Sequence, residues 1–234
     1  FGWSLIRPLI TSFAMAFGFG KVAKMGIDSD IPFILVVVPG VIVWLFFSQS
    51  LLTISNSIIQ NSNLVTKVYF PRLIIPLSTI FLGLIDVIVS IFLFFGFCIY
   101  FGFLPDIKIL FVPIIILLTY LSAFGVGLMS AVLNVKFRDI GQIIPFFIQF
   151  GFIFSPVGYT TESVIKNVSN PLLQKLFLLN PVTGAIDALR WSMLGENAQF
   201  NWNSFIPLII FIILTFVFAI RFFRKHENSF VDYI

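Results

Sequence analysis

The segment that decides the fold class is residues 73–102, which read LIIPLSTIFLGLIDVIVSIFLFFGFCIYFG. Asp86 is the single charged residue in this stretch. A membrane-spanning helix needs about 20 mainly apolar residues, so these residues can cross a bilayer with some tilt. The whole chain has the same character, since 59% of its 234 residues are hydrophobic and 10% are charged. A soluble domain carries roughly a quarter charged residues, so the sequence excludes that class and predicts an integral membrane protein.

Five further apolar runs predict spans at about 1–20, 32–59, 109–133, 140–159 and 205–223. The expected fold is therefore all-α, a single transmembrane domain over 1–234 with six transmembrane helices. Pro76 should kink or restart the third span, and Pro145, Gly151, Pro156 and Gly158 should break the fifth. Gly125 and Gly127 should allow close helix packing. Because the chain begins at Phe1 inside an apolar run, we expect a segment to precede it.

The connecting segments also have recognisable patterns. Residues 60–72 are basic and amphipathic but too short to span, which predicts an interfacial helix and turn. Residues 134–139 form a second basic turn. Within the long stretch 160–203, one helical piece is expected at 171–179. A second should begin at Asn180, an N-cap followed by Pro181, and end near 195. Neither piece can span, so residues 171–195 are expected to form a re-entrant or interfacial pair before the last span.

Basic residues indicate the orientation of the chain. With six spans, the termini share a side with the turns at 60–72 and 134–139. These turns and the C-terminal end of the chain together contain seven basic residues. The short connections of the opposite side contain three, namely Lys21, Lys24 and Lys108. The positive-inside rule therefore predicts that both termini are cytoplasmic. A net charge of +4 spread over the ends of apolar runs suits lipid headgroups and does not suggest nucleic acid.

Few side chains can support chemistry. Asp86 is the acidic residue deep inside a span, where it either relays protons or packs against a neighbouring helix or subunit. His226 and Cys98 are each the sole residue of their type, so neither predicts a metal site, and Cys98 reads as a small buried hydrophobe. No glycine-rich phosphate loop occurs, so this chain should bind no ATP and no other cofactor.

The roles of two sets of residues, the Asp187 and Arg190 side chains and the phenylalanine rings of the spans, can each be interpreted in two ways. Asp187 and Arg190 lie three positions apart on the second short helix and can form an ion pair, which favours a structural role over a functional one. The spans are also rich in phenylalanine, which occurs 32 times. Lipid-facing packing explains most of these rings. A substrate path whose aromatic side chains stack on sugar rings is the alternative.

Several motifs in order resemble a known family. They are Trp3 with Pro8, the turn from Asn63 to Arg72, the turn from Asn134 to Asp139, Phe154 to Tyr159, Leu179-Asn180-Pro181 leading to Arg190, and Phe230-Val231-Asp232. Together they resemble the membrane subunit of type-2 ABC exporters, in the branch that exports O-antigen, capsule or teichoic acid.

The resemblance implies a bacterial inner-membrane homodimer that engages separate cytoplasmic ATPase subunits, on which ATP and Mg are bound. Its substrate would be a polysaccharide on a polyprenyl-diphosphate lipid. Carried over to this sequence, the ATPase-coupling residues are Asn63, Leu64, Lys67, Tyr69, Phe70 and Arg72, with Lys136, Arg138 and Asp139 in the second cytoplasmic turn. The re-entrant segment carries Asn180, Pro181, Asp187 and Arg190. Candidate residues along the substrate path are Trp3, Arg7, Phe146, Phe150, Phe154 and Tyr159.

Competing functions remain at this point. An exporter of drugs or lipids would share the fold. A secondary transporter or channel would depend on Asp86 and need no ATPase. A membrane-embedded glycan-modifying enzyme would need a polar catalytic cluster, and the sequence contains none that we recognise.

Overall fold

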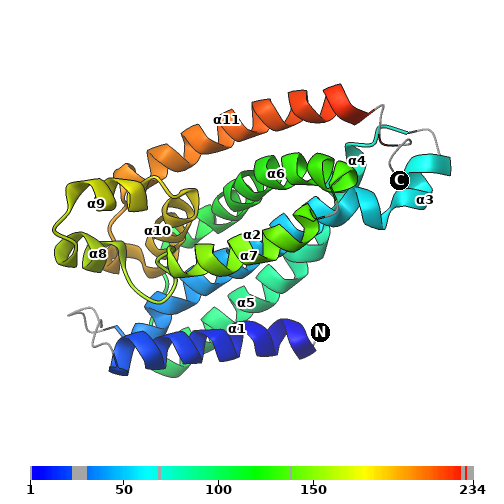
Figure 1. The fold of residues 1–234 in the computed structure, drawn as a ribbon. Helices are drawn as coiled ribbons and strands as arrows, with labels where there is room; N and C mark the ends of the chain where they lie inside the picture. Colours follow the sequence, from blue (N-terminus) through cyan, green and yellow to red (C-terminus); the bar gives the residue numbers. More distant parts are fainter. Residues whose placement is uncertain (1, 23–30, 68–69, 138, 228–229, 231–234) are drawn as a thin grey trace.

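The structure is a computed structural model, and it describes residues 2–22, 31–67, 70–137, 139–227 and 230. Every secondary-structure element in these residues is a helix (Figure 1). Four of the described helical segments are long and apolar enough to cross a membrane: Phe33–Gln60, Ile74–Phe101, Ile107–Lys136 and Trp202–His226. The prediction of an all-helical membrane protein is therefore confirmed.

The elements follow one another as a series of long helices joined by short ones. They are α1 (Gly2–Met15) with the π-helix η1 (Ala16–Val22), α2 (Phe33–Gln60), α3 (Ser62–Lys67), α4 (Ile74–Ser78), α5 (Ile80–Phe101), the 3-10 helix η2 (Ile107–Phe111), α6 (Val112–Lys136), α7 (Ile140–Ile153), α8 (Thr161–Asn167), α9 (Pro171–Leu178), α10 (Pro181–Leu194), the 3-10 helix η3 (Gly195–Asn197) and α11 (Trp202–His226).

Helices α2 and α6 form the centre of the bundle. Helix α2 is buried along most of its length and packs on α6, α10, α5 and α1, while α6 also packs on α11. Small residues bring the central helices close together, because a Cβ at Gly127 would lie 2.8 Å from Ile54 Cγ2 of α2. A Cβ at Gly125 would lie 2.5 Å from Thr215 Oγ1 of α11. The predicted role of these two glycines in close packing is confirmed.

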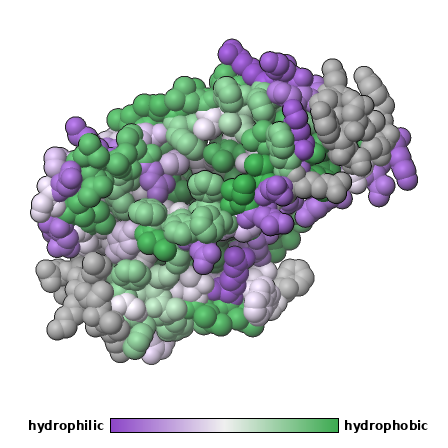
Figure 2. Space-filling view, in the orientation of Figure 1, coloured by the Kyte–Doolittle hydropathy of each residue, from purple (hydrophilic) through white to green (hydrophobic). Residues whose placement is uncertain are grey.

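The outer helices expose apolar side chains along the sides of the bundle. Phe81, Phe92 and Ile99 of α5 are 70%, 70% and 84% exposed. Figure 2 shows this apolar surface, with hydrophilic residues gathered at both ends of the long axis and beside the N-terminal half of α1. Apolar sides and polar ends match the layers of a bilayer, so this surface should face lipid.

The two ends of the bundle differ in composition. We call the end that holds α3 and the last turn of α11 the α3 end, and the end that holds α8, α9 and α10 the α10 end (Figure 1). Helix α2 connects the two, because it begins at the α10 end and finishes beside α3. Polar groups at one end are therefore separated from those at the other by the length of a spanning helix.

Some local features differ from the sequence-based expectations. Helix α7 runs unbroken through Pro145 and Gly151, and it ends at Ile153 rather than near 159. The break expected at Pro156 is confirmed, because a proline disfavours helical backbone at the preceding serine. Helix α8 was not expected, because its seven residues show no apolar period. Pro76 does coincide with a restart, since α4 ends at Ser78 and α5 begins at Ile80.

Candidate functional site

A buried hydrogen-bond network joins three helices at the α3 end. Asn134, 2% exposed near the end of α6, donates from Nδ2 to the Ser55 carbonyl oxygen at 3.2 Å and to Asn56 Oδ1 at 3.0 Å. Its Oδ1 accepts a hydrogen bond from the main-chain N–H of Gly141, in the first turn of α7, at 3.0 Å. We call this group the Asn134 junction. It fixes the ends of α2 and α6 and the start of α7 relative to one another.

Next to the junction, helix α3 presents much of the predicted coupling segment to solvent. Asn63, Leu64 and Lys67 are exposed, while Val65 is 3% exposed and anchors the helix to the bundle. Phe70 and Arg72 are partly buried. Arg72 Nη1 donates to the carbonyl oxygen of Glu227, just after α11. The segment 60–72 is thus attached both to the end of α2 and to the end of α11.

The second predicted turn lies at the same end. Lys136 and Asp139 are exposed on either side of the break between α6 and α7. The ammonium of Lys136 lies 5.4 Å from the ring centre of Phe137, a cation–π contact. Tyr69 and Arg138, also predicted for the two coupling segments, lie outside the described residues. Lys67 of α3 and Lys136 of α6 are thus both exposed at the α3 end of the bundle.

A pocket of about 60 Å³ with both polar and apolar lining residues lies between α1, α2 and α5. Trp3 and Arg7 of α1, Gln49 of α2, and Asp86 and Ser90 of α5 all contribute to its lining. The pocket brings together two of the predicted path residues and the intramembrane carboxylate, although Arg7 and Asp86 lie 79 positions apart in the sequence. We call it the α1–α5 pocket.

Three of the remaining predicted path residues lie on or just after α7. Phe146, Phe150 and Phe154 are 59%, 45% and 66% exposed, and the rings of Phe146 and Phe150 lie 4.5 Å apart. They occur at four-residue spacing and therefore share one face. Tyr159 lies elsewhere, with its hydroxyl donating to the Ile153 carbonyl oxygen at 3.0 Å and its ring 5.6 Å from that of Phe19. Helix α2 packs on both α1 and α7, so the two groups of path residues flank it.

At the α10 end, helix α10 is held by its cap and by a buried arginine. Asn180 is the N-cap, with Oδ1 accepting from Val182 N at 3.0 Å, and its Nδ2 donates to Ser155 Oγ at 3.1 Å. Pro181 occupies the first helical position, as the sequence predicted. Arg190, 4% exposed, donates from Nε to the Val36 carbonyl oxygen at 2.9 Å. Its Nη2 donates to the carbonyl oxygens of residues 156 and 157 at 2.6 and 3.1 Å. Arg190 thereby ties α10 to α2 and to the chain after α7.

The expected ion pair between Asp187 and Arg190 is not formed among the described residues, where Lys108 with Asp106 is the pair observed. Asp187 instead accepts hydrogen bonds from Thr161 Oγ1 at 2.7 Å, Ser204 Oγ at 2.9 Å and Asn201 Nδ2 at 3.3 Å. The side chains of Asp187 and Arg190 therefore form their hydrogen bonds with uncharged groups on other elements. The three-residue spacing of the two side chains along α10 could not indicate these partners.

Burial shifts the pKa values of both Asp187 and Arg190. It raises the pKa of Asp187, an effect partly offset by the hydrogen bond from Thr161 and by the nearby charge of Arg190. Burial likewise lowers the pKa of Arg190 to about 10, and the charge of Asp187 opposes this shift. Arg190 remains protonated at neutral pH, so a positive charge persists in the interior of this end.

Sequence reasoning missed the Asn134 junction and the polar residues around Asp187. Asn134 was noticed within a motif, but nothing in its neighbourhood indicated that it would be buried against residues 78 and 79 positions away. The amide-rich stretch 197–203 was the available signal for a polar site at the α10 end. Within the described residues, no group of three or more His, Cys, Asp or Glu side chains is placed to hold a metal ion.

Comparison with known proteins agrees with this architecture. Residues 1–194 match the family described as ABC-2 type transporter. The chain belongs to this family. It is therefore a membrane transport subunit, which confirms the resemblance seen in its motifs.

Curated relatives extend over most of this ABC-2 permease. It is 26% identical to an O-antigen export system permease protein RfbA of Klebsiella pneumoniae, over 98% of this chain and 85% of the relative. A second protein of that name from Klebsiella pneumoniae is 27% identical with the same coverage. One from Myxococcus xanthus is 25% identical over 78% of this chain and 68% of its own length.

Proposed function

We propose that this permease is the transmembrane subunit of an ATP-driven exporter that moves a polysaccharide carried on polyprenyl diphosphate. Transport would run from the cytoplasmic to the outer face of the bacterial inner membrane. The observation that supports this most directly is the nearly full-length similarity to O-antigen export permeases. Capsule and teichoic acid are chemically related substrates that the same path would accept.

The proposed topology has six spans, with α1 and α7 added to the four long segments. The α3 end then lies in the cytoplasm together with both termini, which places the basic turns where the positive-inside rule favours them. Helices α9 and α10 would form the re-entrant pair on the outer side. The capped start and buried polar groups of α10 suit a short helix shielded by protein.

The proposed pathway runs along the face formed by α1 and α5, at the interface of a homodimer. Arg7 and Asp86 are both exposed there in the single chain, on helices whose other exposed residues are mainly apolar. A carboxylate facing hydrocarbon is costly, so a second copy covering this face would be stabilising. Arg7 beside Trp3 would then offer a charge to the diphosphate and an aromatic ring to a sugar.

An apolar groove adjoins the pocket on the same two helices. Its volume is about 650 Å³, and Leu5, Phe13, Phe97 and Tyr100 contribute to its lining. A groove of this composition suits a prenyl or acyl chain. The phenylalanine stripe on α7, at positions 146, 150 and 154, would supply further surfaces for stacking on sugar rings.

The proposed coupling surface is the exposed side of α3 with the turn at 134–139. Family membership implies an ABC ATPase as partner, and Asn63, Leu64 and Lys67 are accessible to it. ATP and Mg would be bound by that partner. Closure of the ATPase would push α3, and the Asn134 junction would pass the movement to α2, α6 and α7 together.

The test is deletion of the gene, followed by fractionation of lipid-linked glycan and analysis of the cell surface. Accumulation of glycan on the cytoplasmic face with loss of surface polysaccharide is the expected result. Unchanged surface glycan in the deletion strain would overturn the polysaccharide assignment and direct attention to drug or lipid export.

A further inference from the structure

A second pocket, of about 260 Å³, lies at the α10 end and away from the α1–α5 pocket. Its wall combines buried charge, amides and an aromatic ring from α8, α10, η3 and the chain leading into α11. The lining residues that matter for its chemistry are Glu162, Asp187, Arg190, Asn197, Gln199 and Phe200. We call it the α10 pocket. Its volume approaches the lower end of small-molecule sites, about 300 Å³.

The inner wall of the α10 pocket is rigid because its charged side chains are held from several elements. Asp187 receives its three hydrogen bonds from the start of α8 and the start of α11, and Arg190 is bound to α2 and residues 156–157. Arg190 Nη1 is buried and has no hydrogen-bond partner among the described residues. A buried donor without a partner is costly, and a ligand that accepts its hydrogen bond would remove that cost.

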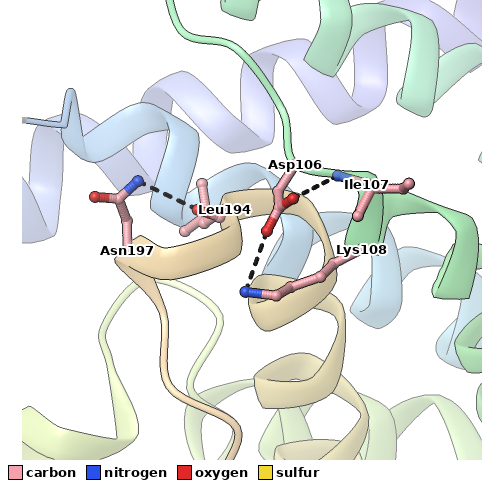
Figure 3. A network of polar contacts seen from close by, with 5 residues as sticks. All are labelled: Asp106, Ile107, Lys108, Leu194 and Asn197. Carbon is pink, nitrogen blue, oxygen red and sulfur yellow. Dashed lines mark hydrogen bonds and ion pairs between the residues drawn. The ribbon is translucent and has the colours of Figure 1, made fainter.

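The rim of the pocket is anchored from outside. Figure 3 shows the turn before η2 lying against the end of α10, where Lys108 Nζ is 3.1 Å from Asp106 Oδ2 and Asn197 Nδ2 donates to the Leu194 carbonyl oxygen at 3.3 Å. Gly195 has a φ of +64°, and a Cβ there would lie 2.6 Å from Asp106 Cβ, so glycine allows this close approach.

Aromatic neighbours hold the ring of Phe200 in place. It packs edge-on against Trp191, with ring centres 5.0 Å apart, and against Trp202 at 4.7 Å. Phe205 completes the cluster at 5.0 Å. An aromatic ring fixed in this way offers a preformed apolar surface at little entropic cost.

The charge balance of the pocket excludes strongly charged ligands. Its described lining contains two carboxylates, Glu162 and Asp187, against one guanidinium, Arg190. The exposed carboxylate of Glu162 opposes a phosphate, while the guanidinium in the wall disfavours a cation. A neutral ligand with many hydroxyl groups fits best, because hydroxyls both donate and accept hydrogen bonds and so match amide, carboxylate and guanidinium partners.

We propose that the α10 pocket binds a neutral sugar residue of the polysaccharide as it reaches the outer side of the membrane. The inference rests on the proposed function and adds a specific sugar subsite to it. Arg190 and the amides of Asn197 and Gln199 contact the hydroxyl groups, and Phe200 covers an apolar face of the sugar ring. The subsite would hold the emerging chain after each transport step and oppose its return.

Binding is measured on the purified permease in detergent, by intrinsic fluorescence, because Trp191 and Trp202 pack on Phe200 beside the pocket. The probe is the oligosaccharide released by mild acid from the cells' own surface polysaccharide, with inorganic phosphate as the anionic counter-probe. Gln199→Ala removes one exposed hydrogen-bonding side chain and should weaken oligosaccharide binding about five- to tenfold. Ala198→Trp should fill the pocket and abolish binding.

Glu196→Gln is the matched control, since Glu196 is exposed next to the pocket without lining it. Size-exclusion profiles show that each variant is folded. Oligosaccharide binding that is absent in the wild type, or equal in wild type and Ala198→Trp, would overturn the proposal, as would a preference for phosphate.

The failure of this proposal is distinguishable from failure of the proposed function. Surface polysaccharide in the deletion strain, complemented with each variant, reports export independently of binding. Normal export by wild type without oligosaccharide binding overturns the subsite alone. Surface polysaccharide that does not depend on the gene overturns the exporter assignment, whatever the pocket binds.

Discussion

Replacing Asn134 with alanine should destabilise the permease more than any other single amide substitution at the α3 end. The side chain makes three hydrogen bonds, two to neighbouring residues of α2 and one to α7, at 3.2, 3.0 and 3.0 Å, and is 2% exposed. Alanine would leave the Gly141 N–H and the Asn56 amide oxygen without these partners, and water has little access to replace them.

The magnitude follows from the number of contacts. Hydrogen bonds contribute about 1 kcal/mol each in soluble proteins and about 0.6 kcal/mol between membrane helices. Three contacts therefore predict a loss of about 2–3 kcal/mol. For a chain of this size, that corresponds to a fall in melting temperature of about 4–12 °C.

The assay is the loss of the monodisperse size-exclusion peak after heating in detergent for a fixed time. Asn56→Ala is the matched control, because it removes only one of the three contacts of Asn134. It also removes a hydrogen bond from Asn56 to the Leu52 carbonyl oxygen within α2, and should cost about 1–2 kcal/mol. An Asn134→Ala protein that melts within about 1 °C of wild type, or together with Asn56→Ala, would refute the idea that the junction holds the three helices.

The remaining predictions concern coupling, packing and the intramembrane carboxylate. Charge reversal at Lys67 and Arg72 should lower export in cells while the ATPase activity of the purified complex persists, and normal export would count against α3 as the coupling helix. Gly184→Ala should cost about 1–3 kcal/mol, because a Cβ there meets a main-chain oxygen of α11, whereas Gly96→Ala, with open space around it, should be neutral or stabilising in the same melting assay. Asp86→Asn should keep most of the export activity, and its complete loss together with nucleotide-independent transport would support an ion-coupled transporter instead.

Short-range signals explain which parts of the structure could be predicted. The length of the apolar runs indicated membrane-spanning helices, and Asn180 with Pro181 marked the start of α10 correctly. Gly125 and Gly127 indicated close packing on α6. Helix α8 was missed because it is short and lacks an apolar period. The breaks expected at Pro145 and Gly151 were wrong because a membrane helix tolerates proline and glycine, whereas α7 does end before Pro156.

The candidate site depended on contacts that no local pattern encodes. Arg190 binds the carbonyl oxygen of Val36, which lies 154 residues away, rather than Asp187 three residues away. Arg7 and Asp86 line one pocket although they belong to different expected spans. Helices that are apolar on every side show no periodicity that distinguishes the buried face from the lipid-facing one.

The sequence by itself determined that this protein is a helical membrane protein, because water is excluded from the bilayer and a long apolar segment must satisfy its own backbone hydrogen bonds as a helix. The order of its motifs also identified its family. Only the tertiary structure decided which polar side chains meet inside and at the ends of the bundle. That choice depends on how complementary helix surfaces pack at close range, with small residues such as Gly127 allowing the approach, and it is a property of three-dimensional contacts between distant residues.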